Sequence, residues 1–422
     1  MKVMTPHYYK DFRCIAGACT DTCCAGWDVD VDKNSYKYYK TVKGAFGKRL
    51  KSVMVPSQDG ECTFTLKEGG RCPFLNDDNL CDLYIELGED KLCETCAEFP
   101  RFINDYGNIR EIGIAPSCKT AGELMFSYKD ELTFDTVEDN SLIPEPNDID
   151  AYTYMQLRQA RIVAFGIISD RDINIFERLA LYIDFAKRIQ KHLDAERDEL
   201  IAGVAKRFCG LDYRENLLAK LKSRDIASPA ESQDSGIKQP DKSDSSAIKS
   251  EAYEPHGTRL IKGLRHFFDD FKGMEVINPD WNIHVARVRQ FLDGLADDSE
   301  LAAVMKDYHA GSEAFAHEYE QLAMYYVYRY MLDAVNDYDV LLKAKNAVIG
   351  ILAVDIMAAA NRVAGQQSDF RKPDFTMRVD IAHLYSRQFE HSYYNYEVYR
   401  EYFGTKRCYS YEFLMDALVS LN

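Results

Sequence analysis

Ten of the twelve cysteines lie within the first 118 residues, and several are spaced closely enough to bind one metal ion together. The first four form the pattern C-x4-C-x3-C-C, and Cys93 and Cys96 form C-x2-C. Thiolates that are close in sequence converge on one ion at little entropic cost, because the loop between them is short. Four thiolates suit tetrahedral zinc or an iron–sulfur cluster. The predicted metal ligands are Cys14, Cys19, Cys23, Cys24, Cys72, Cys81, Cys93, Cys96 and Cys118.

Two other interpretations of these cysteines are disulfides and buried free thiols. The first residues, MKVMTPHYYKDFRC, lack the apolar core of a signal peptide, so we expect a cytoplasmic protein. The cytoplasm is reducing, which favours metal ligation over disulfides. An iron–sulfur cluster is favoured over zinc because the cysteines outnumber one tetrahedral shell. Cys209 and Cys408 stand alone within helical patterns and are expected to be free thiols.

The segment that carries these cysteines reads as loops and short strands. Residues 1–145 are rich in Gly, Asp and Pro, and their apolar runs are short, as in CTFTL (62–66) and IREIGIA (109–115). The predicted fold class is therefore mainly α with an irregular, cysteine-rich, metal-binding N-terminal region, α+β overall. We expect four parts: a cysteine-rich domain (1–145), a helical domain (146–223), a flexible linker or loop (224–257) and a second helical domain (258–422).

Apolar residues recur at helical spacing through most of the remaining chain. Asp148 or Asp150 is placed to cap the first of these helices, and Asp172 the second. Residues 224–257 are rich in Ser, Asp, Lys and Pro and hold too few large apolar side chains to form a core. Helices are predicted over residues 154–168, 176–193, 212–222, 258–271, 313–335, 338–363, 377–392 and 409–421.

The charge and hydropathy patterns argue against two classes of partner. With 52 basic and 68 acidic residues, the net charge is −16, which repels nucleic acid and anionic membrane surfaces. The most apolar stretch, AVIGILAVDIMAAA (347–360), is short for a membrane span and contains Asp355. We expect it to be a buried helix, and we expect neither nucleic acid nor a membrane as partner.

The cysteine motifs carry a resemblance to known proteins. The first four cysteines, CPFL (72–75) and LCDLY (80–84) resemble the zinc- or iron-chelating proteins with a CxxCxxCC motif. The longer arrangement, with LCETCAEFPR (92–101), PSCK (116–119) and a helical C-terminal half, is similar to the flagellin lysine-N-methylases. This chain departs from the shorter pattern in the spacing of its first cysteines, so the identity of each ligand stays open.

The resemblance implies an enzyme that transfers methyl groups from S-adenosylmethionine to lysine side chains of flagellin. Because flagellin leaves the cytoplasm through a narrow export channel, the resemblance also implies that this partner is met before assembly. Methyl transfer to an amine is a displacement, in which a deprotonated lysine nitrogen attacks the sulfonium methyl group. Two other classes of function remain open: a non-enzymatic metal-binding module whose helical half docks a partner, and an electron-transfer protein.

The donor site and the catalytic residues are not assigned by the sequence. No Gly-rich strand–turn–helix of the dinucleotide-binding type is present. Asp28, Asp30 and Asp32 occupy every second position of an expected strand, which places them on one face. This face either attracts a lysine or is simply solvated. The tyrosines of MYYVYRY (324–330) and YYNYEVY (393–399) either hold an ammonium group or form packing stripes.

Substitution of Cys19, Cys23 or Cys24 by Ser is expected to remove bound metal and to destabilise the N-terminal region, because metal binding supplies folding free energy. The measurement is iron, zinc and acid-labile sulfide content after anaerobic purification, with thermal unfolding of the same samples. Cys209→Ser and Cys408→Ser are the controls and should keep full metal content. Equal metal loss from these controls and from the Cys19, Cys23 and Cys24 variants would show that the division into metal ligands and free thiols is wrong.

Overall fold

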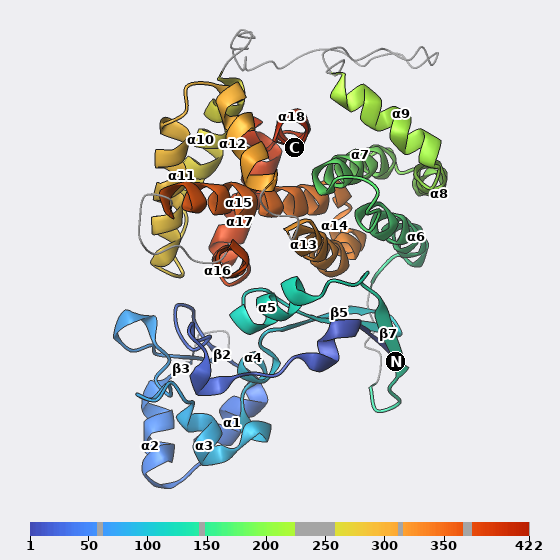
Figure 1. Cartoon of the computed structure of the whole chain (residues 1–422). Coiled ribbons are helices and arrows are strands. Elements are labelled where there is room, and N and C mark those ends of the chain that lie inside the picture. The colour runs from blue at the N-terminus through green and yellow to red at the C-terminus, as the bar shows by residue number, and fades with distance from the viewer. Residues whose placement is uncertain (57–61, 143–147, 224–257, 311–314, 366–373, 422) are drawn as a thin grey trace, which may run out of the picture.

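The helical and the cysteine-rich parts of the chain form two lobes, and a small sheet lies where they meet (Figure 1). The structure is a computed structural model that describes residues 1–56, 62–142, 148–223, 258–310, 315–365 and 374–421. It is mainly helical, with its strands in the N-terminal third, as the sequence predicts. The predicted linker, 224–257, lies outside the described residues.

The cysteine-rich lobe is built around a small hydrophobic core of its own. Helix α1 (Lys33–Thr41) is capped by Asp32, whose side chain accepts hydrogen bonds from two backbone N–H groups of the first turn. The lobe also contains α2 (Gly44–Val53), α3 (Asp82–Leu87), α4 (Glu94–Glu98) and a three-stranded sheet in the order β2 (Asp30–Val31), β4 (Cys62–Phe64), β3 (Met54–Pro56). The core of the lobe consists of Val29, Val31, Tyr39, Leu50, Cys62, Phe64, Cys72, Phe74, Leu75, Leu83 and Cys93.

A four-stranded sheet joins this lobe to the helices. Its order is β5 (Arg101–Tyr106), β6 (Ile109–Ile114), β1 (Lys2–Pro6) and β7 (Phe134–Glu138), with β1 and β6 parallel. Helix α5 (Lys119–Ser127) leads out of the sheet toward the helical half. The predicted strands within 62–66 and 109–115 are confirmed as β4 and β6.

Buried polar contacts fix the sheet against the helical half. Arg161 forms a two-pronged ion pair with Glu111 of β6, and both side chains are almost fully buried. Tyr328 donates a hydrogen bond from its hydroxyl to the carbonyl oxygen of Met4 at 2.7 Å. Apolar residues of the sheet also belong to the same hydrophobic core as the helices. The domain boundaries expected from the sequence stay a prediction.

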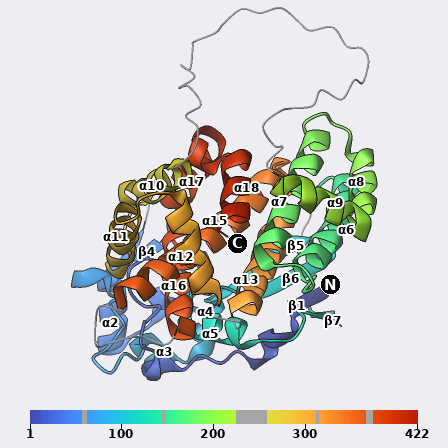
Figure 2. The same ribbon diagram turned by 45° about the horizontal axis from the view of Figure 1, so that its top comes forward.

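Helix α15 (Val340–Gly365) runs through the middle of the helical half and is buried along most of its length (Figures 1 and 2). It packs against α7, α11, α13 and α16. A helix that is apolar all round must be buried, which accounts for its central position. The other long helices are α6 (Ala151–Ile168), α7 (Ile175–Leu193), α8 (Ile201–Phe208), α9 (Leu211–Lys222), α10 (Arg259–Asp270), α11 (Asp280–Asp293), α12 (Asp298–Ala310), α13 (Phe315–Tyr330), α16 (Asp374–Glu390), α17 (Tyr393–Thr405) and α18 (Tyr411–Ser420).

Among the described residues, α15 is the one helix long and apolar enough to cross a membrane, by length and composition alone. Of its most apolar window, 83% is buried inside the protein. The expectation of a buried helix over 347–360 is therefore confirmed.

Seven of the eight predicted helices are present in the described residues, with ends that shift by a few positions. The predicted helix over 313–335 is divided into α13, a 3-10 turn (Met331–Asp333) and α14 (Ala334–Asp337), and its residues 313 and 314 lie outside the described residues. Asp150 caps α6, as one of the two predicted alternatives. The predicted cap of the second helix is wrong: Asn174, not Asp172, accepts the hydrogen bond at the start of α7. In the helical half, α8, α11, α12 and α17 were not predicted.

Gly263 of α10 is predicted to be intolerant of alanine. A Cβ atom at this position would overlap the ring of Phe413 on α18, which is buried. Gly263→Ala should lower the free energy of unfolding by about 1–3 kcal/mol, because overpacking outweighs the gain in helix propensity.

The matched control is Gly203→Ala on α8, where an added Cβ would meet no atom within 4 Å. This variant should gain up to about 1 kcal/mol of stability. Urea unfolding of the two variants gives the comparison, and an equal effect of both would contradict the close approach of α10 and α18.

Candidate functional site at the junction of the two lobes

All nine predicted metal ligands lie in the cysteine-rich lobe or where it meets the helical half, and none is in a disulfide. Cys14 is exposed, Cys72 and Cys93 are buried, and the others are half-buried. Cys118 is the residue that precedes α5. The two cysteines expected to be free thiols, Cys209 and Cys408, lie in the helical half.

Five of the thiols influence one another around Cys24. The backbone N–H of Cys72 donates to the carbonyl oxygen of Cys24 at 2.8 Å. Burial raises the pKa of the Cys72 thiol to about 12, and the charges of Cys24 and Cys81 add to the rise. A hydrogen bond with Cys93 raises the pKa of Cys96, and burial and the charges of Cys93, Cys24 and Cys72 raise it further.

The remaining four thiols interact around Cys23. A hydrogen bond with Cys24 raises the pKa of Cys23, and burial and the charges of Cys24, Cys118 and Cys14 add to the effect. Burial raises the pKa of Cys118 to about 11, with further contributions from Cys19 and Cys14. The Cys23–Cys24 dipeptide therefore connects two groups of thiols: Cys14, Cys19, Cys23 and Cys118, and Cys24, Cys72, Cys81, Cys93 and Cys96.

Each group has at least the four thiols that a site with four thiolate ligands requires. Within the described ranges, however, no three His, Cys, Asp or Glu side chains are arranged around a point where a metal ion could sit. The side chains of each group are of the type that binds a metal as thiolates. To ligate one, however, the thiols of a group would have to turn toward a common centre. Iron–sulfur or zinc binding and the nine ligands stay a prediction.

The loop that carries the first four cysteines is fixed to helix α16 through Asp21. Its Oδ2 lies 2.6 Å from Nε2 of His383, and its Oδ1 accepts a hydrogen bond from Nη1 of Arg387 at 2.9 Å. Arg387 also donates to the carbonyl oxygen of Ala25. Burial opposes ionisation of Asp21, but the hydrogen bonds and charges of His383 and Arg387 hold its pKa below the usual value. We call this contact the Asp21 latch.

Next to the latch, the two lobes enclose a cleft of about 970 Å³. Gly26 stands at its wall with φ +89°, and an added Cβ there would meet the carbonyl oxygen of Ile277 at 2.5 Å. Glycine is thus required where the cysteine loop touches the helical half. The lining comes from both lobes and comprises Gly26, Trp27, Asp28, Asp30, Leu66, Gly69, Gly70, Thr95, Glu98, Phe99, Pro100, Arg101, Ala115, Ser117, Glu275, Val276, Ile277, Pro279, Arg329, Glu390, His391, Ser392, Tyr393 and Tyr394.

The charged side chains of the cleft are unequally neutralised. Glu390 accepts hydrogen bonds from Tyr325, Arg329, Tyr330 and Ser386, so this carboxylate and Arg329 satisfy each other. Arg101 donates to the hydroxyl of Tyr9 at 2.9 Å. The other acidic residues of the lining, Asp28, Asp30, Glu98 and Glu275, leave the cleft with an excess of negative charge.

His391 is a neutral group in this cleft at physiological pH. Burial, together with the charges of Arg387, Arg329 and His383, lowers its pKa to about 3. Its ring packs edge-on against Trp27, with centroids 4.6 Å apart, and lies 5.5 Å from the ring of Phe99. His391 therefore contributes an aromatic surface rather than a positive charge.

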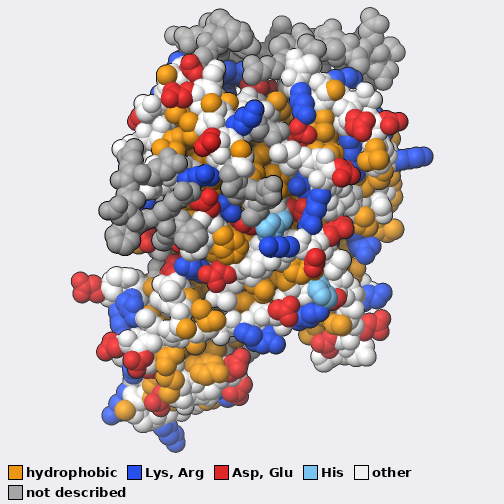
Figure 3. All heavy atoms as spheres, viewed as in Figure 1, with side chains coloured by type: hydrophobic (Ala, Val, Ile, Leu, Met, Phe, Trp, Pro, Cys, Tyr) orange, Lys and Arg blue, Asp and Glu red, His pale blue; other side chains and the backbone are white. Residues whose placement is uncertain are grey.

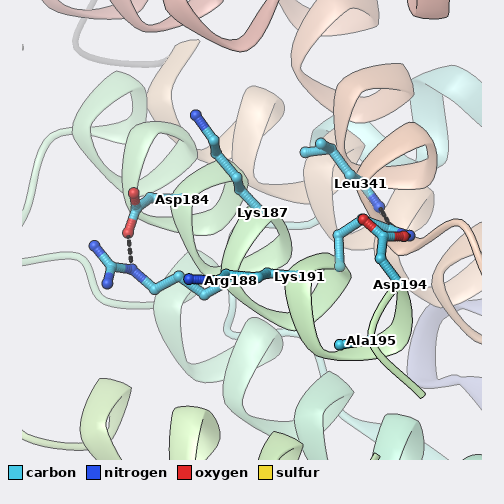
Figure 4. Close-up of a pocket in the computed structure, with 8 residues that line it drawn as sticks. Asp184, Lys187, Arg188, Lys191, Asp194, Ala195 and Leu341 are labelled. Carbon is cyan, nitrogen blue, oxygen red and sulfur yellow. Dashed lines mark hydrogen bonds and ion pairs between the residues drawn. The ribbon is translucent and has the colours of Figure 1, made fainter. Parts of the chain in front are cut away.

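A second pocket of about 640 Å³ lies far from this junction, along α7 (Figure 4). Lys187, Arg188 and Lys191 line it together with Asp184 and Asp194. Arg188 is paired with Asp184 at 2.6 Å, and Lys187 with Glu412 at 3.2 Å. It is an open surface groove whose charges are largely paired. On the face drawn in Figure 3, acidic and basic side chains are likewise interspersed.

Comparison with known proteins identifies the family of the chain. The family model "FliB lysine N-methylase C-terminal domain" matches residues 161–416. The chain therefore belongs to this family. The matched region contains α16, which forms the helical side of the latch, and the residues of the cleft from 275 onward.

Curated relatives match over a shorter stretch. The chain is 30% identical over 121 residues to "Flagellar biosynthetic protein FliU" of Salmonella muenchen, covering 28% of this chain and 72% of that protein. It is 29% identical over 121 residues to the "Lysine-N-methylase" of Salmonella choleraesuis and to that of Salmonella typhimurium. The match again covers 28% of this chain, but only 30% of each of those two proteins. No solved structure matches the chain.

The structure separates the acidic and tyrosine motifs singled out in the sequence. Asp28 and Asp30 line the cleft, whereas Asp32 is used as the cap of α1. Tyr393 and Tyr394 line the cleft too, but the tyrosines of 324–330 lie on α13 and are mostly buried in the protein core. Glu275 and His391 were missed, because nothing in their local sequence signals that distant segments meet there.

The latch is predicted to contribute to stability. Asp21→Asn removes the counter-ion of Arg387, whose side chain is 3% exposed. Removing one partner of a fully buried ion pair costs more than removing one from a pair that is partly exposed. Because the side chain of Asp21 is 27% exposed, the substitution should lower the free energy of unfolding by about 2–3 kcal/mol, at or below the low end of the range for buried pairs. Chemical denaturation measures it, with Asp148→Asn, an exposed residue, as the control expected within about 0.5 kcal/mol of the parent. Parental stability of Asp21→Asn would contradict the latch.

Proposed function

We propose that this protein transfers methyl groups from S-adenosylmethionine to lysine side chains of flagellin. Membership of the FliB lysine N-methylase family supports the reaction class. The structural observation that carries the proposal is the cleft between the lobes, whose lining combines an excess of carboxylates over basic side chains with aromatic rings. Carboxylates attract a lysine ammonium group, and ring faces accept both its charge and its carbon chain.

The reaction is a displacement at the donor's methyl carbon. A lysine ε-nitrogen that has lost its proton to water or to a carboxylate forms the new N–CH3 bond, while the S–CH3 bond of the sulfonium breaks. The electron pair of that bond stays on sulfur, and the leaving group is the neutral thioether. The cleft residues must hold the lysine, align it with the methyl group and exclude water.

We propose further that the cysteines bind an iron–sulfur cluster, with zinc as the alternative. The ligands would come from the two groups of thiols around Cys23 and Cys24. Bound metal would fix the loop from Cys14 to Cys24, which continues directly into Gly26 and Trp27 of the cleft. When bound, the metal centre supplies a cross-link in a segment with a small core.

The proposed acceptor is flagellin in the cytoplasm before assembly, and neither nucleic acid nor a membrane is proposed as a partner. The net charge of −16 and the acidic excess in the cleft favour a cationic protein segment. A lysine on unassembled chain can reach into the cleft, whereas one packed in a filament has less freedom to do so.

The test is incubation of anaerobically purified protein with monomeric flagellin and a labelled methyl donor, followed by mass spectrometry of the lysines. Transfer to lysine ε-amines is the expected result. Absence of transfer by protein with a full complement of metal would overturn the assignment.

The salt dependence of the reaction tests whether the acidic cleft captures lysine by electrostatic attraction. Raising the ionic strength from about 0.05 to about 0.5 M should lower kcat/KM several-fold with kcat less affected, because screening weakens capture of lysine more than chemistry. Assembled filament, in the same series, should be methylated more slowly than monomer. A kcat/KM value that does not change with salt would contradict electrostatic capture.

A further inference from the structure

Three rings form a continuous surface on one side of the cleft, and we call Trp27, Phe99 and His391 the aromatic wall. The indole is fixed because its Nε1 donates to the carbonyl oxygen of Cys23 at 2.7 Å. The centroid of Phe99 lies 5.8 Å from that of Trp27 and 5.5 Å from that of His391. These distances are contact distances, so a ligand cannot enter between the rings. All three are half-buried and line the cleft, so a ligand can lie across them.

Three carboxylates stand beside the wall, and we call Asp28, Glu98 and Glu275 the acidic rim. Among the residues that the structure describes, the side chains of Asp28 and Glu98 make no hydrogen bond or ion pair. Glu275 receives a hydrogen bond from the Ser392 hydroxyl at 2.7 Å. Its backbone is fixed by Gln388 and Asn395, both buried. The rim therefore presents negative charge to the cleft from two exposed carboxylates and from one that is held by a hydrogen bond.

We propose that the aromatic wall and the acidic rim form the acceptor slot, which binds a lysine side chain of an extended peptide segment. The aliphatic stem lies across the wall, and the ammonium group faces the rim. This inference rests on the proposed function and adds the residues that recognise the acceptor. The rim includes residues of both lobes, so the slot exists only while the lobes are joined.

The chemistry of the slot matches lysine better than other cationic side chains of proteins. A lysine has four methylene groups that pack on apolar surface and one compact charge at its end. The neutral state of His391 at physiological pH avoids a positive charge beside the ammonium group. A sulfonium donor is also cationic and also packs on rings, so the experiment must separate donor from acceptor.

The chain carries its own reporter of this slot. It has two tryptophans: Trp27, in the wall, and Trp281, which is 1% exposed in the helical core. The probes are a short Gly/Ser peptide with one central lysine and the same peptide with norleucine, each titrated into the full-length, metal-loaded protein while emission is recorded. S-adenosylhomocysteine, which lacks the sulfonium charge, and sinefungin, a cationic analogue of the donor, are titrated separately.

The lysine peptide should change the emission of Trp27 saturably, and the norleucine peptide should not. The change should disappear in Trp27→Phe. Glu98→Gln and Asp28→Asn should each raise the Kd of the lysine peptide about two- to fivefold, the range for exposed ion pairs. Glu215→Gln, an exposed residue of α9, is the matched control and should leave Kd unchanged. Thermal unfolding of each variant verifies folding.

Each outcome decides between the slot and the reaction. If flagellin is methylated while the lysine peptide leaves Trp27 unchanged, the slot is wrong and the proposed function stands. If the lysine peptide binds as described but no methyl transfer occurs, the slot stands and the function fails. If sinefungin alone saturates the Trp27 response and the lysine peptide does not compete, the wall belongs to the donor site and the proposal is overturned.

Discussion

The contact between Asp21 and the two α16 side chains, His383 and Arg387, determines where the cleft lies. It joins a loop with no core of its own to a buried helix of the main core. Arg387 and His383 are both almost fully buried, so each needs a partner, and the loop supplies one carboxylate for both. Lys119 adds a second tie by pairing with Asp380 at 2.8 Å and donating to Thr20 at 3.1 Å. These contacts place the cysteine loop, which Gly26 and Trp27 follow directly, whereas Asp30 is held by the pairing of β2 with β4.

This dependence relates the cysteines to the cleft without requiring them to react. The Cys23 carbonyl orients the indole of Trp27, and Gly26 permits the backbone to approach Ile277. A conformational change in the cysteine loop would therefore shift the aromatic wall, which begins only a few residues further along the chain. The cysteine loop and its docking on α16 thus act together. They position an aromatic and acidic surface against α16 and α17.

Much of the helical half was predictable, because apolar periodicity is a local property of the sequence. The runs over 176–193 and 338–363 became α7 and α15 for this reason. The cysteine groups were predictable in part, since spacing indicates which thiols are neighbours. The cleft was not, because Phe99, Glu275 and His391 are brought together by packing between segments far apart in the chain. Asp32 illustrates the same limit: alternation placed it with Asp28 and Asp30, but the start of α1 uses it as a cap.

The central claim is that an acceptor lysine enters the cleft between the cysteine-rich lobe and α16–α17. A peptide whose central lysine is replaced by a photoreactive lysine analogue tests this most directly, with cross-links mapped by mass spectrometry on the full-length protein. The account predicts cross-links to Trp27, Phe99 and the residues beside them, and competition by the unmodified lysine peptide. Cross-links concentrated in the groove along α7, at Lys187 to Asp194, would contradict it.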